Sequence, residues 1–144
     1  MNKKMISIKC YFIIKGYARG EALVSKEPIS FWGDFDPKTG CIISKTNSLY
    51  NQNVKGKILI FPYGRGSSTS SAIFLEAVRL GNAPAAIINI KTEPILAVGA
   101  LLAEKLYNIT IPIVYTRETD PTKIFKTGDY IEIDGFNNII RKLN

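Results

Sequence analysis

Hydrophobic and polar positions alternate through much of the first third of the chain, which is the pattern of strands with one buried face. Residues 6–14 combine this alternation with β-branched and aromatic side chains, so they predict a strand. A second short strand is expected at residues 22–25, and a third at 41–44, directly after the Asp-Pro-Lys-Thr-Gly turn of residues 36–40. Residues 45–56 are mostly polar and predict a loop.

From Lys57 onward the pattern changes, and short apolar runs alternate with segments of helical periodicity. Buried strands are expected at residues 57–62, 84–90 and 111–115, with a closing strand at 129–133. Helices are expected at residues 67–80 and 94–106, with one further helical turn at 121–125. This order of elements predicts a single α/β domain over residues 1–144, with a mixed and partly parallel sheet.

Each of the two longer predicted helices has a face suited to packing on a sheet. In the first helix this face is an apolar stripe of Ile73, Ala77 and Leu80. In the second helix it consists mainly of small residues, namely Leu96, Gly99, Ala100 and Ala103. We therefore expect both helices to pack closely through these faces.

The composition is that of a globular protein with an anionic partner. Of the 144 residues, 46% are hydrophobic and 22% are charged, which excludes a disordered chain. The 19 Lys and Arg residues exceed the 12 Asp and Glu residues, and the formal net charge is +7. Such a surplus favours a nucleic acid, an acidic protein face or a phosphorylated or carboxylated small molecule. The basic residues are scattered rather than clustered, so we expect no nucleic-acid partner.

Three absences narrow the possible chemistry and location. The chain has no histidine, the most common general base and metal ligand. Its two cysteines, Cys10 and Cys41, lack metal-ligand spacing and are interpreted as reduced thiols. With no apolar run of 18 residues and no signal-peptide pattern, we expect a cytoplasmic protein without a membrane partner. Chemistry must then come from hydroxyls, Lys, Arg, carboxylates or a partner.

The segment 61–72 is the best candidate for a binding site, because it joins a buried strand to a helix. In open α/β sheets, ligands bind at this junction, and the first turn of the helix attracts anions. Gly64 and Gly66 would let the backbone approach a ligand closely and adopt a positive φ, and Arg65 has a planar fork suited to carboxylate or phosphate. Hydroxyl groups follow on Ser67, Ser68, Thr69 and Ser71.

This segment matches none of the common motifs that bind anions or activate a serine. It lacks the lysine of a P-loop, the third glycine of the dinucleotide fingerprint and the Gly-x-Ser-x-Gly elbow of lipases. From the residues alone, a polar, capped helix start without a ligand therefore remains an alternative.

A second segment, residues 20–36, contains the single tryptophan, Trp32, between Phe31 and Phe35. These aromatic residues are most simply explained as core. Because Trp32 also lies among Ser, Gly and Asp residues, it could instead form the wall of a site or a partner contact.

Several motifs occur in a fixed order between residues 16 and 133. They are Gly20-Glu-Ala-Leu-Val-Ser, Pro28-Ile-Ser-Phe-Trp-Gly, Asp36-Pro-x-Thr-Gly, Pro62-x-Gly-Arg-Gly-Ser-Ser-x-Ser-Ser, Ala83-Pro-Ala-Ala-Ile-Ile and Pro94-Ile-Leu-Ala-x-Gly-Ala. In this combination the chain resembles the small subunit of the aconitase-X family, and Gly-Arg-Gly-Ser-Ser is the most specific element. One departure is Asp34, which stands where a second glycine after Gly33 is expected.

The resemblance implies a swivelling β/α/β domain that pairs with a separate larger subunit as a heterodimer. The larger subunit would hold a [4Fe–4S] cluster, and no cofactor is expected on this chain. The implied reaction is a hydro-lyase step of the archaeal mevalonate (isoprenoid) pathway. It removes water from (R)-5-phosphomevalonate, a phosphorylated carboxylate, to give trans-anhydromevalonate 5-phosphate.

The resemblance also implies roles for residues of the loop. By motif position Ser67, the first serine after Gly66, is the expected catalytic base, and Ser68 remains the alternative. The expected substrate-binding residues are Gly64, Arg65, Gly66 and Ser68. Two other functions stay open, since a bacterial branch of the family dehydrates cis-3-hydroxy-L-proline and the chain could be a non-catalytic anion-binding domain.

Overall fold

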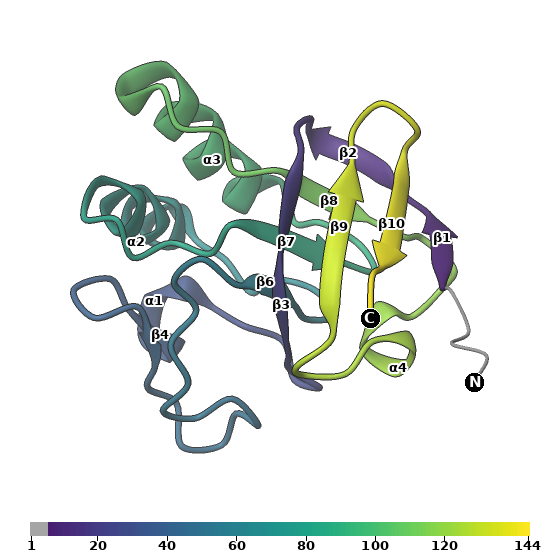
Figure 1. Cartoon of the computed structure of the whole chain (residues 1–144). Coiled ribbons are helices and arrows are strands. Elements are labelled where there is room, and N and C mark those ends of the chain that lie inside the picture. The colour runs from purple at the N-terminus through teal and green to yellow at the C-terminus, as the bar shows by residue number, and fades with distance from the viewer. Residues whose placement is uncertain (1–5) are drawn as a thin grey trace.

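The computed structural model describes residues 6–144; the first five residues of the predicted domain lie outside this range. The strands are β1 (Ser7–Lys9), β2 (Tyr11–Ile14), β3 (Ala18–Val24), β4 (Phe35–Asp36), β5 (Cys41–Ile42), β6 (Ile58–Ile60), β7 (Ala86–Asn89), β8 (Ile113–Tyr115), β9 (Tyr130–Asp134) and β10 (Ile139–Lys142). The helices are α1 (Phe31–Asp34), α2 (Ser68–Arg79), α3 (Pro94–Tyr107) and α4 (Pro121–Ile124). Eight strands form one sheet in the order β1-β10-β9-β3-β6-β7-β8-β2, and β4 pairs with β5 in a separate hairpin (Figure 1).

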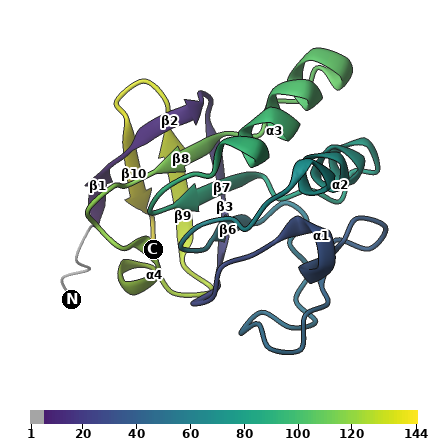
Figure 2. The same ribbon diagram turned by 180° about the vertical axis from the view of Figure 1, so that it is seen from behind.

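The central part of the sheet is parallel, as the alternation of strands and helices predicts. β3, β6, β7 and β8 are parallel neighbours, and α2 and α3 make the crossovers from β6 to β7 and from β7 to β8. Both helices lie side by side on one face of the sheet (Figures 1 and 2). The mixed, partly parallel α/β fold is therefore confirmed, and the carboxyl ends of these strands share one edge.

The single strand predicted at residues 6–14 is wrong, because Cys10 divides it into β1 and β2. β1 pairs with β10, whereas β2 pairs with β8 at the opposite end of the strand order. One continuous stretch of chain therefore joins the two edges, and the sheet curls round on itself. The Cys10 N–H donates to the carbonyl of Asn138 at 3.0 Å, which fixes the junction.

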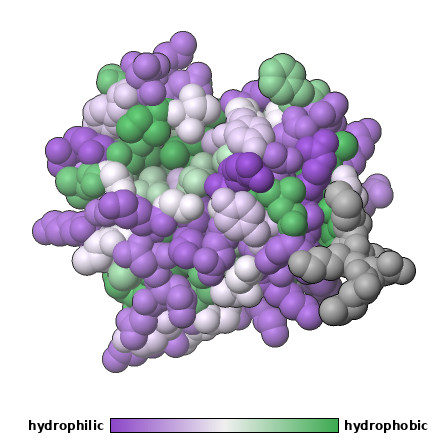
Figure 3. Space-filling model, in the orientation of Figure 1, coloured by the Kyte–Doolittle hydropathy of each residue, from purple (hydrophilic) through white to green (hydrophobic). Residues whose placement is uncertain are grey.

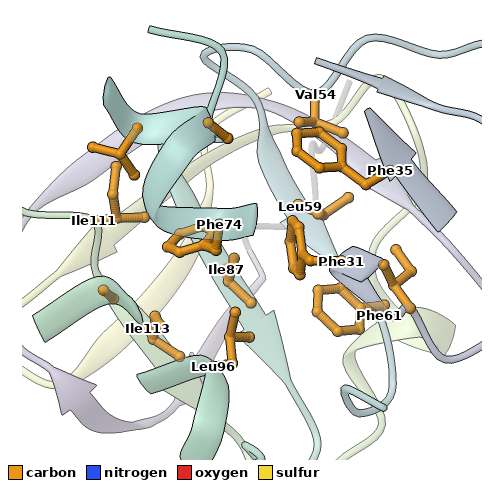
Figure 4. Close-up of a cluster of buried hydrophobic side chains, with 14 of the residues drawn as sticks. Phe31, Phe35, Val54, Leu59, Phe61, Phe74, Ile87, Leu96, Ile111 and Ile113 are labelled. Atoms are coloured by element: carbon orange, nitrogen blue, oxygen red, sulfur yellow. The ribbon is translucent and has the colours of Figure 1, made fainter. Parts of the chain in front are cut away.

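Two hydrophobic clusters lie on opposite faces of this curled sheet. One fills its interior and includes Ile58, Ile60, Val114 and Phe125. The other lies between the sheet and the helices (Figure 4); its labelled members are Phe31, Phe35, Val54, Leu59, Phe61, Phe74, Ile87, Leu96, Ile111 and Ile113. Because β6 and β7 are covered on both faces, their sequences are continuously apolar rather than alternating.

Three further details differ from the sequence-based expectations. β3 begins at Ala18 rather than at residue 22, and β9 is not the closing strand because β10 follows it. In the predicted stripe of α2, Ala77 is buried and Ile73 is partly buried, but Leu80 is exposed, and Phe74 and Val78 are buried beside Ala77. The predicted face of α3 is confirmed, since all four of its residues are buried. Within residues 6–144, each helix is too short or too polar to cross a membrane.

Candidate active site

The loop after β6 is held in place by the segment that follows β3. The Arg65 N–H donates to the carbonyl of Ile29 at 3.0 Å, and the Ile29 N–H donates to the carbonyl of Tyr63 at 3.4 Å. The chain then enters α2 with Ser67 as the N-cap residue. These hydrogen bonds fix the path of the loop up to the start of α2. The first backbone N–H groups of α2 have no partner within the helix and point out of its N-terminal end.

The hydroxyl groups after Gly66 fall into two kinds. Those of Ser67 and Ser68 are on exposed residues, and although Ser67 is the N-cap residue, its side chain makes no capping hydrogen bond. Those of Ser70 and Ser71 are on buried residues and have partners. Ser71 was expected among the hydroxyls free for a ligand, and this is wrong because it donates to the carbonyl of Ile95 in α3.

Gly66 is required for close approach rather than for a special backbone conformation. A Cβ atom at Gly66 would lie 2.6 Å from Oε2 of Glu93, so the carboxylate packs directly against the glycine. Neither Gly64 nor Gly66 has a positive φ, and that part of the expectation is wrong.

Glu93 is a residue of this site that sequence reasoning missed. Its carboxylate caps α3 by accepting hydrogen bonds from the N–H groups of Ile95 at 2.6 Å and Leu96 at 3.2 Å. Pro94 is a sequence signal for a helix that begins here, whereas Glu is not among the preferred N-cap residues. Only the fold shows that the same carboxylate lies against Gly66 and so links the starts of α2 and α3.

The second candidate segment lies beside the first, and its aromatic residues have different roles. Phe31 is buried, with its ring centroid 6.4 Å from that of Phe61 and 5.2 Å from that of Phe74 (Figure 4). Phe35 is buried as well. Trp32 is 62% exposed, and its backbone N–H donates to the hydroxyl of Ser70 at 3.4 Å. Phe31 and Phe35 are therefore core residues, whereas Trp32 is available at the surface next to α2.

Arg65 lines a polar cavity of about 270 Å³ that is distinct from the surface around Ser67 and Ser68. The cavity is also lined by Glu27, Pro28, Asp34, Ser44, Thr46 and Asn47. The Ser48 N–H donates to Glu27 at 2.6 Å and lowers the pKa of this carboxyl, so Glu27 is charged at neutral pH. The Arg65 guanidinium consequently has anionic neighbours on this side, and its role toward a ligand stays a prediction.

The described residues do not provide a site for an iron–sulfur cluster. Within residues 6–144, no group of three or more His, Cys, Asp or Glu side chains is arranged to hold a metal. Cys10 and Cys41 are both free, and burial raises the pKa of the Cys10 thiol to about 11. Protein-bound clusters are held by several thiolates. A cluster in this system would therefore need ligands from another chain.

Comparison with known proteins identifies the class to which this fold and loop belong. The model of the family described as the aconitase X swivel domain matches residues 7–142, and the chain belongs to this family. The structure of Thermococcus kodakaraensis aconitase X in its holo-form superposes with a TM-score of 0.85. It is 32% identical in sequence, and the match covers 96% of this chain and 99% of that chain. The family resemblance of the sequence motifs is thus confirmed.

The similar curated proteins carry one particular name. The chain is 47% identical to the phosphomevalonate dehydratase small subunit of Methanocella arvoryzae, across 94% of this chain and 98% of the relative. It is 42% identical to the phosphomevalonate dehydratase small subunit of Methanosarcina acetivorans, across 94% and 90% of the two chains. Similarity of this extent covers the whole fold as well as the candidate loop.

Proposed function

We propose that this chain is the small subunit of a hydro-lyase that dehydrates (R)-5-phosphomevalonate to trans-anhydromevalonate 5-phosphate in the mevalonate pathway. The observation that supports this most strongly is the 42–47% identity to relatives named phosphomevalonate dehydratase small subunit, over at least 94% of this chain. In this proposal residues 1–144 form one swivel domain of a cytoplasmic heterodimer.

The proposal divides the chemistry between two chains. The word "small" in the names of the relatives implies a larger partner subunit. We assign the [4Fe–4S] cluster to that subunit, because this chain has only two cysteines and no histidine. This chain would contribute the groups at the start of α2.

Ser67 acts as the base in this proposal, and its place at the N-terminus of α2 supports the role. Its Oγ, as the alkoxide, takes the proton from the carbon next to the substrate carboxylate, and the electrons of that C–H bond form a carbon–carbon double bond. The hydroxyl leaves the neighbouring carbon with its bonding electrons and takes up a proton from solvent to become water, and Ser67 returns its own proton to solvent to restore the base. A serine is a weak base in water, so the alkoxide requires stabilisation by the helix N-terminus and by a nearby cation such as Arg65.

The remaining loop residues bind the substrate in the proposed complex. Because Gly64 and Gly66 carry no side chains, an anion can approach their backbone from the side that the Glu93 carboxylate does not cover, and Ser68 places a second hydroxyl beside that of Ser67. Arg65 would pair with the carboxylate or phosphate. The net charge of +7 is favourable for a substrate that carries both groups.

The larger subunit is expected to cover the face that carries residues 63–71 and 31–33. The base must reach a substrate that another chain holds, so this face has to lie at the subunit boundary. Trp32 and Tyr63 are exposed there, and exposed aromatic residues are common in interfaces.

The decisive experiment is an assay of the reconstituted pair. The chain and its cognate larger subunit, co-purified without oxygen, should convert (R)-5-phosphomevalonate into a product lighter by one water, detected by mass spectrometry and phosphorus NMR. cis-3-Hydroxy-L-proline serves as the competing substrate. Conversion of hydroxyproline alone would contradict the proposed substrate. The isolated chain should show neither activity nor absorbance from iron.

A further inference from the structure

Helix α3 is apolar on its outer side as well as on the side that packs against the sheet and α2. Leu96, Gly99, Ala100 and Ala103 are buried, and the opposite side exposes four further aliphatic residues: Val98, Leu101, Leu102 and Leu106. Val98 is 50% exposed and Leu106 is 62% exposed. A helix that is hydrophobic all round is normally covered all round. The apolar outer side of α3 therefore indicates that another protein surface covers it.

This apolar surface continues into a groove of about 420 Å³ between α2 and α3. Ala72 and Leu75 of α2 and Ile95, Val98 and Leu102 of α3 line it, and Ser68 lies at its end. Figure 3 shows hydrophobic surface gathered over α2 and α3, in the upper left of the molecule. We call the groove and the exposed aliphatic side chains of α3 together the apolar groove.

We propose that the apolar groove is the docking surface for the larger subunit and receives an apolar ridge of that chain, an inference that rests on the proposed function. The groove ends at Ser68, next to the candidate base, so it is continuous with the face that the larger subunit must cover. One partner surface can then both fill the groove and bring its substrate to the start of α2.

The charge distribution supports a stable subunit interface rather than a transient contact. Within α3, which the structure describes in full, Lys105 is the only charged residue at an exposed position. Depletion of charge and a high fraction of apolar surface are typical of interface cores. Soluble proteins usually keep exposed apolar side chains dispersed over the surface. A contiguous exposed apolar surface therefore indicates an interaction site.

A second copy of this chain is a less suitable occupant. A copy seated in the apolar groove would lie across Ser68 and would block the start of α2 in both protomers, because a two-fold interface uses the same surface twice. The larger subunit has to approach this end of the helix in any case. The geometry therefore favours the heteromeric contact.

The test measures binding rather than turnover. Leu102→Glu and Val98→Glu each place a charge in the apolar groove, and Phe136→Glu is the matched control, since Phe136 is 95% exposed in the turn between β9 and β10. Affinity for the cognate larger subunit is measured by calorimetry, with circular dichroism to select the variants that are folded. We expect each groove variant to bind at least about tenfold more weakly, as for a residue at the centre of an interface. The control should bind within about twofold of the wild type, as a surface substitution outside the contact should.

Unchanged affinity in a folded groove variant would overturn the proposal. So would a wild-type chain that forms a homodimer through the groove, if Leu102→Glu breaks that dimer without weakening the larger-subunit complex. Failure of the proposed function is a separate result: a tightly bound wild-type pair that leaves (R)-5-phosphomevalonate intact would contradict the reaction and leave the docking surface in place.

Discussion

The hydroxyl groups that follow Gly66 differ in what they contact, and this difference makes the serine assignment testable. Ser67→Ala should reduce turnover of the assembled enzyme about 10²–10⁴-fold, because a lost general base has an effect of this size. Its thermal unfolding should be nearly unchanged, since Ser67 makes no capping hydrogen bond. Steady-state kinetics and calorimetric melting of the variant give the two measurements.

Ser68→Ala and Ser71→Ala are the controls for this result. Ser68→Ala should reduce turnover less than Ser67→Ala, and the reverse order would move the base to Ser68. Ser71→Ala should instead lower stability by about 0.5–1.5 kcal/mol, because the hydrogen bond from the Ser71 hydroxyl to the carbonyl of Ile95 is lost. If both Ser67→Ala and Ser68→Ala remain active, the serine-base mechanism is wrong.

The two cysteines should differ strongly in reactivity. Burial raises the pKa of the Cys10 thiol to about 11, and the charge of Asp134 adds to the effect, so little thiolate exists at neutral pH. Cys41 is only partly buried, at the start of β5. An alkylating reagent at pH 8 should therefore label Cys41 first and Cys10 only after unfolding, as measured by peptide mass spectrometry. Equal labelling of both in the folded chain would contradict the closed junction between β1 and β2.

At the scale of elements, the close approach of α2 and α3 decides where the site residues lie. Gly99 makes this approach possible, because a Cβ atom at this position would lie 2.9 Å from the carbonyl oxygen of Ser71. The same contact region includes the hydrogen bond from Ser71 to Ile95 and the Glu93 carboxylate against Gly66. Small side chains on α3 thus hold the start of α2 beside the start of α3.

Gly99→Ala should destabilise the protein although alanine favours helices. The helical preference of alanine over glycine is worth about 1 kcal/mol, whereas overpacking at a backbone contact costs about 1–3 kcal/mol. We expect a net loss of stability in urea unfolding. Ala97→Gly, at a partly buried position on the same helix, measures the helical preference alone. A gain in stability from Gly99→Ala would show that the helices have room to separate.

The sequence predicts elements well where periodicity and packing agree. The four residues predicted for the packing face of α3 are all buried, because small and apolar residues at helical spacing allow a helix to pack closely on its neighbours. For α2 the same reasoning fails at Leu80, because the helix ends there and the residue turns outward. Local pattern therefore predicts which residues form a helix better than it predicts which face the fold covers.

Pairing over long distances explains the other differences. Alternation in residues 6–14 indicates an extended chain, but it does not specify that the halves on either side of Cys10 pair with different strands. Glu93 is similar: it directly precedes the predicted helix at residues 94–106, but only the fold brings its carboxylate to Gly66. The strand–helix junction predicted at residues 61–72 is present, and the binding roles of Ser67 and Arg65 in it stay predictions.

At the scale of the whole molecule, the sheet curls round on itself, and α2 and α3 form a helical layer on one of its faces (Figure 1). The stretch 7–14 closes the sheet, and β6, β7 and β8 direct their carboxyl ends toward the same edge. The candidate base precedes α2, Trp32 belongs to α1, and the apolar groove lies between α2 and α3; Figure 1 shows these helices on the same side of the sheet. The side that carries the helices is therefore available to a partner, whereas the curled sheet on the other side maintains the fold.

An ion network joins β9 and β10 in the hairpin beside β1, and the titration of its carboxyl groups predicts how the stability of the fold depends on pH. Arg141 contacts Glu132 at 2.9 Å and Asp134 at 2.8 Å. The Asn137 amide and Arg141 lower the pKa of Asp134 well below its usual range, and the Tyr17 hydroxyl and Arg141 lower that of Glu132. A carboxyl with a lowered folded-state pKa stabilises the fold above its unfolded-state pKa, and this contribution is lost as the pH falls through the folded-state value.

We therefore expect Arg141→Met to destabilise the chain at pH 7, and the difference from the wild type to shrink as the pH falls below about 4, where carboxyl groups begin to be protonated in the unfolded chain. Urea unfolding at a series of pH values measures both stabilities. Arg79→Met is the matched control, because Arg79 forms an exposed pair with Glu76 within α2, and such pairs contribute little. Equal effects of the two substitutions at pH 7, or a difference that does not change with pH, would show that the hairpin network does not maintain the closure of the sheet.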